Sequence, residues 1–162
     1  MTTAYIALGA NLGDPLTQAN LALKAIKQIP NTQCVAVSPL YRSKPLGPQD
    51  QPDYLNAVIE LDTQLAPLDL LHALQQIESQ LGRERKDIRW GARTIDLDIL
   101  LFGDLVVQSA ELTVPHYDMK NREFVIYPLY DLAPNLIFPD GEKIANIIKR
   151  LDKNEMKLWA IR

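Results

Sequence analysis

TIDLDILLF, residues 94–102, is a run of β-branched and large apolar residues that ends at a Gly103-Asp104 turn. This composition and this ending predict a β-strand. Because successive side chains of a strand point to opposite faces, Asp96 and Asp98 are expected on one face, roughly 7 Å apart along the strand. The other face is predicted to contribute four apolar side chains to a core, those of Ile95, Leu97, Ile99 and Leu101.

A cluster of cations precedes this strand. RERKDIRWGAR, residues 83–93, holds five Arg or Lys residues against two acids, a net charge of +3. If these charges only formed surface ion pairs on a helix, each pair would contribute about 0–1 kcal/mol to stability. Hydrogen bonds from a cation to a phosphate are stronger, about 1.5–3 kcal/mol each. Next to a pair of carboxylates, the cluster therefore favours a site that binds nucleotide phosphates.

Composition restricts the class of protein. The chain has 162 residues, 47% hydrophobic and 23% charged, which is typical of one globular domain covering residues 1–162. No apolar run approaches the roughly 20 residues that span a bilayer, and the N-terminus lacks the basic start of a signal peptide. The single cysteine, Cys34, suits a reducing compartment, so a cytoplasmic protein is expected, and a compact single domain predicts a monomer. A net charge of −3 argues against a nonspecific nucleic-acid binder.

The predicted elements alternate in a defined order. Apolar periodicity, together with Gly and Pro breaks, predicts strands at 4–9, 33–41, 54–61 and 94–102 and helices at 15–29 and 67–81. This βαββαβ order predicts an α+β fold with a ferredoxin-like core, an antiparallel sheet and helices packed on it. A C-terminal extension is expected to contain a hairpin near 105–108, a helix at 122–132 interrupted by Pro128, a helix at 142–151 and a docked tail at 157–161.

The third predicted strand has two different faces. Alternation along it places Leu55 and Ala57 on one face and Tyr54 with Asn56 on the other. It follows a loop, residues 43–53, with three prolines and one glycine, which is too long for a hairpin turn and is typical of binding loops. Loops 43–53 and 83–93 are both expected to close over a bound substrate.

Asp-x-Asp on a strand face suits Mg²⁺, which prefers oxygen ligands and keeps waters and substrate phosphates around it. Two such ions can share a carboxylate pair during phosphoryl transfer. The alternative is that the motif only decorates a solvent-facing strand. A glycine-rich phosphate cradle is missing, because the glycine-rich segment 9–13 lacks both Gly-Lys-Ser/Thr and G-x-G-x-x-G. ATP phosphates would therefore be held by side-chain cations and metal.

RWGARTIDLDIL, residues 89–100, resembles the signature of the 6-hydroxymethyl-7,8-dihydropterin pyrophosphokinases, which are folate-pathway enzymes. Leu46-Gly47-Pro48, Asn56 and Val114-Pro115-His116-Tyr117 support the resemblance, which extends over nearly the whole chain. It implies an enzyme that uses ATP and Mg²⁺ to transfer the β,γ-diphosphate of ATP to the hydroxymethyl group of the pterin, with release of AMP. The implied partners are these small molecules, without nucleic acid or membrane.

The resemblance also implies roles for individual residues. Asp96 and Asp98 would hold two Mg²⁺ ions, and Arg83 and Arg93 would join them as catalytic residues that contact the triphosphate. Further ATP contacts would come from Gln75, Glu78, Arg85, Trp90, Ile99, Thr113, His116, Tyr117 and Arg122. The pterin contacts would come from Ser43, Pro45, Leu46, Tyr54, Asn56, Trp90, Asp96 and Phe124, with Tyr54 and Phe124 on the two sides of the ring.

Two positions depart from relatives, and two other functions compete. Lys44 stands where some relatives have proline, and Glu111 stands where some carry an arginine that reaches ATP. A binding module is the main rival, because the same topology serves RNA-binding and ligand-sensing domains. The aromatic RNA-recognition strand motif is absent from the sequence, and a ligand sensor would not need Asp96 and Asp98. The second rival is a kinase that transfers only the γ-phosphate.

Overall fold

The computed structural model describes residues 1–11, 14–43, 53–83, 95–154 and 156–159, with the backbone alone at Arg83. Its strands are β1 (Thr2–Ala10), β2 (Thr32–Val37), β3 (Tyr41–Ser43), β4 (Tyr54–Thr63), β5 (Asp96–Phe102), β6 (Val107–Gln108), β7 (Thr113–Val114) and β8 (Lys157–Leu158). Its helices are α1 (Pro15–Ile26), α2 (Pro67–Arg83), the 3-10 turn η1 (Met119–Asn121), α3 (Glu123–Leu132) and α4 (Ile144–Arg150). Among the described residues, no helix combines the length and apolar character needed to cross a bilayer.

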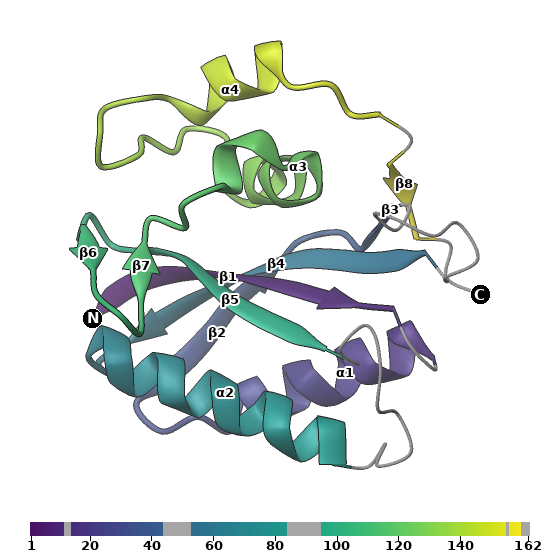
Figure 1. Cartoon of the computed structure of the whole chain (residues 1–162), viewed down its shortest axis with the longest axis vertical. Coiled ribbons are helices and arrows are strands. Elements are labelled where there is room, and N and C mark those ends of the chain that lie inside the picture. Colours follow the sequence, from purple (N-terminus) through teal and green to yellow (C-terminus); the bar gives the residue numbers. More distant parts are fainter. Residues whose placement is uncertain (12–13, 44–52, 84–94, 155, 160–162) are drawn as a thin grey trace.

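The main sheet is antiparallel and has the order β5-β1-β4-β3-β8, with β2 pairing along another part of β4. The units β1-α1-β2 and β4-α2-β5 interleave, because β4 lies between β1 and β2 while β1 lies between β4 and β5. Figure 1 shows α1 and α2 on one face of the sheet, α3 on the other face, and α4 beyond α3. The predicted α+β class with an antiparallel sheet is confirmed.

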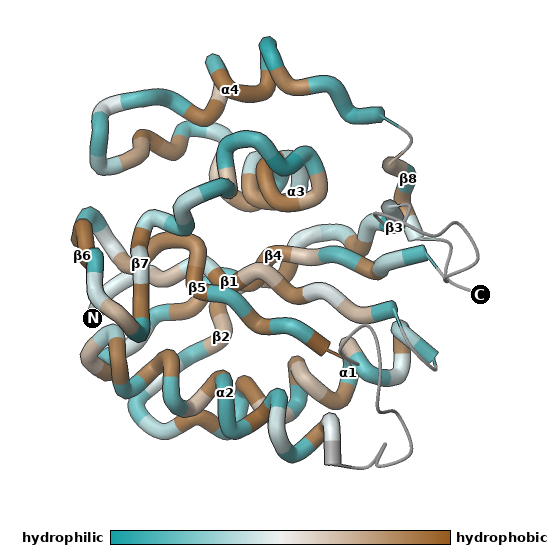
Figure 2. The backbone as a smooth tube through the Cα atoms, in the orientation of Figure 1, coloured by the Kyte–Doolittle hydropathy of each residue, from teal (hydrophilic) through white to brown (hydrophobic). Residues whose placement is uncertain are grey.

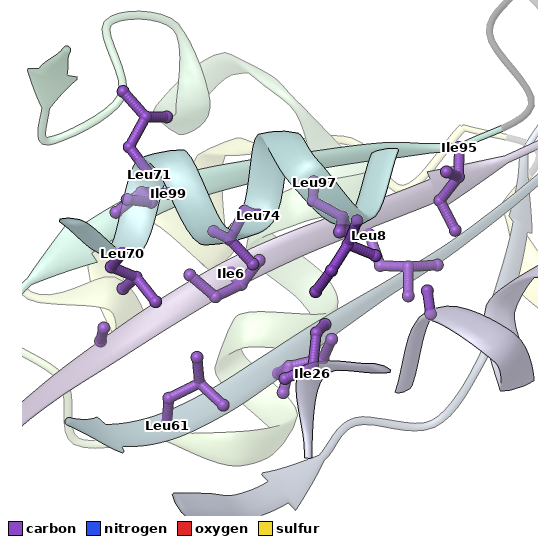
Figure 3. Close-up of a cluster of buried hydrophobic side chains, with 14 of the residues drawn as sticks. Ile6, Leu8, Ile26, Leu61, Leu70, Leu71, Leu74, Ile95, Leu97 and Ile99 are labelled. Carbon is purple, nitrogen blue, oxygen red and sulfur yellow. The ribbon is translucent and has the colours of Figure 1, made fainter. Parts of the chain in front are cut away.

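Each face of the sheet has its own apolar cluster. Ile6 and Leu8 of β1 pack with Leu74 of α2 on one face (Figure 3), and all three are almost fully buried. On the other face, Val58 packs with Val125 and other apolar side chains of α3. Figure 2 shows hydrophobic and hydrophilic positions alternating along α2, as expected for a helix with one face on a sheet.

A β-bulge in β5 makes one part of the predicted strand pattern wrong. The register pairs Ile6 with Ile99 but Tyr5 with Leu101, so Leu100 is an extra residue on β5. Leu101 therefore packs in the α3-side cluster, on the face opposite to Ile99. Leu100 lies on that face too, in line with the alternation from Asp96 and Asp98, and it becomes part of the cavity described below.

Other differences from the predicted elements have local causes. The strand predicted at 33–41 is two strands, because Ser38 lies between them and its Oγ accepts the Val58 N–H at 2.9 Å. The helix α3 continues through Pro128, which is buried with its neighbour Leu129, so packing outweighs the lost hydrogen bond. The first helix ends at Ile26, earlier than predicted, and α4 is shorter than the predicted 142–151.

Candidate active site

A cavity of about 580 Å³ opens on the sheet face that α3 covers. Its walls come from four strands of the sheet (β1, β3, β4 and β5), from the segment that leads into α3 together with the first turn of α3, and from the C-terminal end of the described chain. The lining residues are Ala7, Leu8, Gly9, Ser43, Tyr54, Asn56, Asp96, Asp98, Leu100, His116, Arg122, Glu123, Phe124, Val125, Asn154 and Met156.

Many residues singled out from the sequence meet in this cavity, although they come from distant parts of the chain. They are Ser43, Tyr54, Asn56, Asp96, Asp98, His116, Arg122 and Phe124. Others, namely Gln75, Glu78, Ile99, Thr113 and Tyr117, do not line it. Pro45, Leu46, Arg85, Trp90 and Arg93 lie outside the described residues, as does the side chain of Arg83.

The two aspartates of β5 face the cavity together. Asp96 is half-buried and Asp98 is exposed, while Leu97 between them points into the core on the opposite face. Burial raises the pKa of the Tyr54 hydroxyl, and the negative charge of Asp96 raises it further. The phenol of Tyr54 is therefore neutral at pH 7 and presents its ring and hydroxyl to the cavity next to a carboxylate.

The donor set fits Mg²⁺ that is shared with a substrate. No group of three or more His, Cys, Asp or Glu side chains that could hold a metal ion is found among the described residues. Mg²⁺ does not need such a protein cage, since it is usually held by one or two carboxylates together with waters and substrate phosphates. Asp96 and Asp98 supply these carboxylates at the cavity wall.

His116 is oriented by two backbone contacts. The backbone N–H of His116 donates to the carbonyl of Leu100 at 2.9 Å, and the ring Nδ1 accepts the backbone N–H of Asp118 at 3.3 Å. Burial lowers the pKa of this histidine. The charge of Asp98 raises this pKa, the charge of Arg122 lowers it, and the charge of Asp118 raises it. The imidazole is therefore neutral at pH 7, and because Nδ1 is an acceptor, Nε2 carries the proton. His116 thus contributes a neutral hydrogen-bond donor to a wall that also holds carboxylates.

The protonation of His116 gives a testable pH dependence. In the metal-free protein we expect its NMR titration midpoint below 6.5, and a still lower midpoint in an Asp98→Asn variant, which lacks the opposing charge. Since the unfolded chain takes up this proton at a higher pH, the histidine's contribution to stability is complete above about pH 6.5 and is lost as pH falls through its folded-state pKa. A midpoint above 6.5 in the wild-type protein would contradict the assigned environment.

Arg122 lies at the junction between η1 and α3. Its Nε pairs with Asp118 Oδ2 at 3.2 Å, and its guanidinium carbon is 5.8 Å from the centre of the Phe124 ring. These contacts hold a cation at the cavity wall beside an aromatic face. Tyr117 instead is 80% exposed and stacks on His116 at 4.9 Å between ring centres, outside the cavity lining.

A polar pair lies on β3 and β4. Asn56 is 5% exposed, and its Nδ2 donates to Ser43 Oγ at 2.7 Å. Tyr41, two residues before Ser43, donates its hydroxyl hydrogen to Asp131 of α3, and burial followed by this hydrogen bond raises its pKa. The first bond joins β3 to β4, and the second fixes β3 to α3 on this side of the cavity.

Glu78 of α2 stabilises the strand that carries the aspartates. Its Oε2 accepts the backbone N–H of Leu97 at 2.8 Å, between Asp96 and Asp98. The sequence analysis assigned Glu78 only to the nucleotide and did not predict this contact with the strand.

Replacement of Glu78 by alanine removes the acceptor for the Leu97 N–H. We expect the free energy of unfolding, measured with urea, to fall by about 1–3 kcal/mol. Glu78→Gln keeps an oxygen acceptor and should retain most of that stability. Equal losses in both variants would show that the Leu97 hydrogen bond is not the source of the effect.

The remaining predicted ATP residues lie away from the cavity. Gln75 is exposed on α2, Thr113 is exposed on β7, and the Ile99 side chain is buried in the core beneath the sheet. A contact between Ile99 and ATP would therefore have to come from its backbone. Glu111 pairs with His72 Nε2 at 2.9 Å, and neither residue lines the cavity.

Several lining residues were not predicted from the sequence. Leu100 lies on the same face of β5 as Asp96 and Asp98, but a leucine in this apolar run carries no signal of a ligand site. Asn154 and Met156 belong to a C-terminal segment with no motif and no clear periodicity. The sequence signal for that segment was limited to the apolar stretch 157–161, which predicted docking but not a place at the cavity. Pairing of β8 with β3 confirms the docking for residues 157–158, while residues 160–161 lie outside the described part of the chain.

Comparison with known proteins identifies the family. Residues 5–134 match the family model described as 7,8-dihydro-6-hydroxymethylpterin-pyrophosphokinase. The chain belongs to this family. The pyrophosphokinase relatives named 2-amino-4-hydroxy-6-hydroxymethyldihydropteridine pyrophosphokinase include one from Haemophilus influenzae, 54% identical over 156 residues, covering 96% of this chain and 97% of the relative. Another, from Pseudomonas aeruginosa, is 57% identical over 144 residues, covering 89% of this chain and 88% of the relative.

Solved structures of the pyrophosphokinase family share the fold. The wild-type HPPK-DHPS of Plasmodium falciparum matches with a TM-score of 0.71 and 13% identity over 92% of this chain. An HPPK-DHPS structure in complex with substrates matches with a TM-score of 0.74 and 13% identity over 97% of this chain. The chain spans less than half the length of these two, 44% and 47% respectively.

Proposed function

We propose that this chain transfers the β,γ-diphosphate of ATP to the hydroxymethyl group of 6-hydroxymethyl-7,8-dihydropterin, giving AMP and the pterin diphosphate in folate biosynthesis. The observation that carries the proposal is a single cavity with two chemically different ends, in a chain of the pyrophosphokinase family. The carboxylates of Asp96 and Asp98 come from β5, and the aromatic and amide side chains of Tyr54 and Asn56 come from β4, on the far side of β1.

The sheet order separates these two ends. Asp96 and Asp98 lie on β5 at one edge of the sheet, whereas Ser43 lies on β3, separated from β5 by β1 and β4. ATP would place its phosphates at the β5 end, where Arg122 supplies a cation and His116 a neutral donor. The pterin would lie toward β3, with its ring between Tyr54 and Phe124 and its polar edge at the amide of Asn56.

In this reaction the hydroxymethyl oxygen bonds to the β-phosphorus while the bond from that phosphorus to the α,β-bridging oxygen breaks. AMP leaves with the bridging oxygen, and the hydroxyl proton is released. Such a transfer depends on positioning and on neutralising charge more than on covalent help from the protein. The cavity residues would hold the hydroxymethyl group in line with the triphosphate, and enclosure would keep water from competing as the nucleophile.

Asp96 and Asp98 are the residues that would hold Mg²⁺, two ions in the proposed form of the site. When bound, Mg²⁺ neutralises phosphate charge and stabilises the attacking and leaving oxygens. Arg83, Arg85, Trp90 and Arg93 belong to the proposal through the family signature alone, since they lie outside what the structure describes. On the pterin side, Pro45 and Leu46 also lie outside the described residues and belong to the proposal through the family resemblance alone.

A product assay tests the proposal. Purified protein is incubated with ATP, Mg²⁺ and 6-hydroxymethyl-7,8-dihydropterin, and the nucleotides are separated. We expect AMP to form in proportion to a diphosphorylated pterin. Formation of ADP would instead identify a kinase that transfers one phosphate, and a folded protein without pterin-dependent turnover would favour a binding module.

A further inference from the structure

We propose that Asn154 and Met156 of the C-terminal segment, residues 151–154 and 156–159, form the outer wall of the pterin end of the cavity, and that Met156 selects among pterins. The inference rests on the proposed function and adds a specificity residue to it. Met156 lines the cavity, yet it lies beyond residue 134, where the match to the family model ends.

The strand order places this segment at the pterin end. Figure 1 shows the chain passing from α4, in the layer beyond α3, to β8 beside β3 at the edge of the sheet. Leu158 pairs with Tyr41, and Lys157 pairs with Arg42, next to the Ser43 of the cavity wall. β5 and its aspartates lie at the opposite edge. Contact of this segment with a ligand would therefore involve the pterin rather than the phosphates.

The segment is attached on both sides of Met156. On one side, Asn154 Nδ2 donates to Glu123 Oε1 at 2.8 Å, which connects the segment to the first residue of α3. On the other side, the Trp159 N–H donates to the Leu40 carbonyl at 2.8 Å, and the Arg42 guanidinium lies 4.4 Å from the centre of the Trp159 ring.

Met156 has the properties of a ligand contact. Its side chain is only 5% exposed, so the fold holds it against the cavity. A thioether side chain is polarizable and packs well on the face or edge of an aromatic ring. Because this side chain lines the cavity, its size sets how much space remains for a substituent on the pterin ring. The neighbouring Asn154 has a φ of +56°, so its backbone conformation favours Asn or Gly.

Calorimetric titration with 6-hydroxymethyl-7,8-dihydropterin, in the presence of Mg²⁺ and a non-hydrolysable ATP analogue, tests the inference. Met156→Ala removes the apolar contact and should raise the Kd for the pterin about tenfold. Met156→Leu keeps most of the contact area and should stay within about threefold of the wild type. Leu158→Ala is the matched control on β8, because that side chain is 62% exposed and does not line the cavity, and it should leave the Kd unchanged.

Two further measurements separate binding from folding. Asn154→Gly permits the positive φ but removes the amide that reaches Glu123, so it should raise the Kd severalfold with an unchanged melting temperature. Met156→Ala should also improve the affinity for a ring-methylated dihydropterin relative to the unmethylated one, which loss of stability alone would not do.

The outcomes distinguish the inference from the function on which it rests. Pterin binding by the wild type with an unchanged Kd in Met156→Ala and Asn154→Gly would overturn the inference and leave the proposed function in place. A change in the KM for ATP with no change in pterin affinity would also overturn it. A folded wild-type protein that does not bind the pterin would overturn both.

Discussion

Replacement of Asp98 by asparagine is expected to lower kcat by about 10³-fold or more, with the fold intact. The carboxylate faces the cavity and is exposed, so the core does not depend on it. Asparagine has nearly the same shape but lacks the charge needed to hold Mg²⁺ against the triphosphate. The effect should appear in kcat at saturating ATP and pterin, while the melting temperature stays close to that of the wild type.

Asp104→Asn is the matched control for Asp98→Asn. Asp104 is an exposed aspartate in the turn directly after β5, and it does not line the cavity. This variant has the same change of charge and should keep full activity. Near-normal turnover in Asp98→Asn, or an equal loss in both variants, would remove the carboxylate pair from the account of catalysis.

Replacement of Phe124 by alanine is expected to raise the Kd for the pterin about 10- to 100-fold. Stacking of a heterocyclic base on an aromatic side chain contributes roughly 1–3 kcal/mol by alanine substitution, and the pterin ring resembles a purine base. Phe124 is half-buried on the cavity wall, at the first turn of α3, so its ring is available to a ligand. Calorimetric titration of the variant with the pterin measures the loss directly.

The Phe124→Leu variant separates stacking from simple burial. Leucine fills part of the volume but has no π-face, so most of the loss in pterin affinity should remain. The affinity for ATP, measured separately, should change little because Phe124 belongs to the proposed pterin end. Full pterin affinity in Phe124→Ala would contradict the proposed sandwich with Tyr54.

Regular periodicity explains which parts of the fold could be predicted from the sequence. The long strands and the helices α1 and α2 follow clear apolar patterns. Asp14, directly before Pro15, is predicted as the N-cap of α1, and it accepts hydrogen bonds from Thr17 in that role. Alternation along β4 and the first half of β5 also placed Tyr54, Asn56 and the two aspartates on one face correctly.

The sequence could not predict features that depend on distant contacts. The bulge at Leu100 reverses the face of Leu101, and it arises from pairing with β1 rather than from a local residue pattern. The hydrogen bond from Leu97 to Glu78 joins residues of two different elements. Met156 reaches the cavity only through the pairing of β8 with β3. Such contacts follow from tertiary packing, which local propensity and periodicity do not encode.

The most direct test of the proposed reaction uses ATP labelled on the β-phosphorus, incubated with the pterin and Mg²⁺. Transfer of diphosphate predicts that the label moves to the pterin product and that the nucleotide product is unlabelled AMP. Under the same conditions, Asp98→Asn should leave the label in ATP. A label that remains in the nucleotide as ADP while the pterin gains a single phosphate would contradict the account.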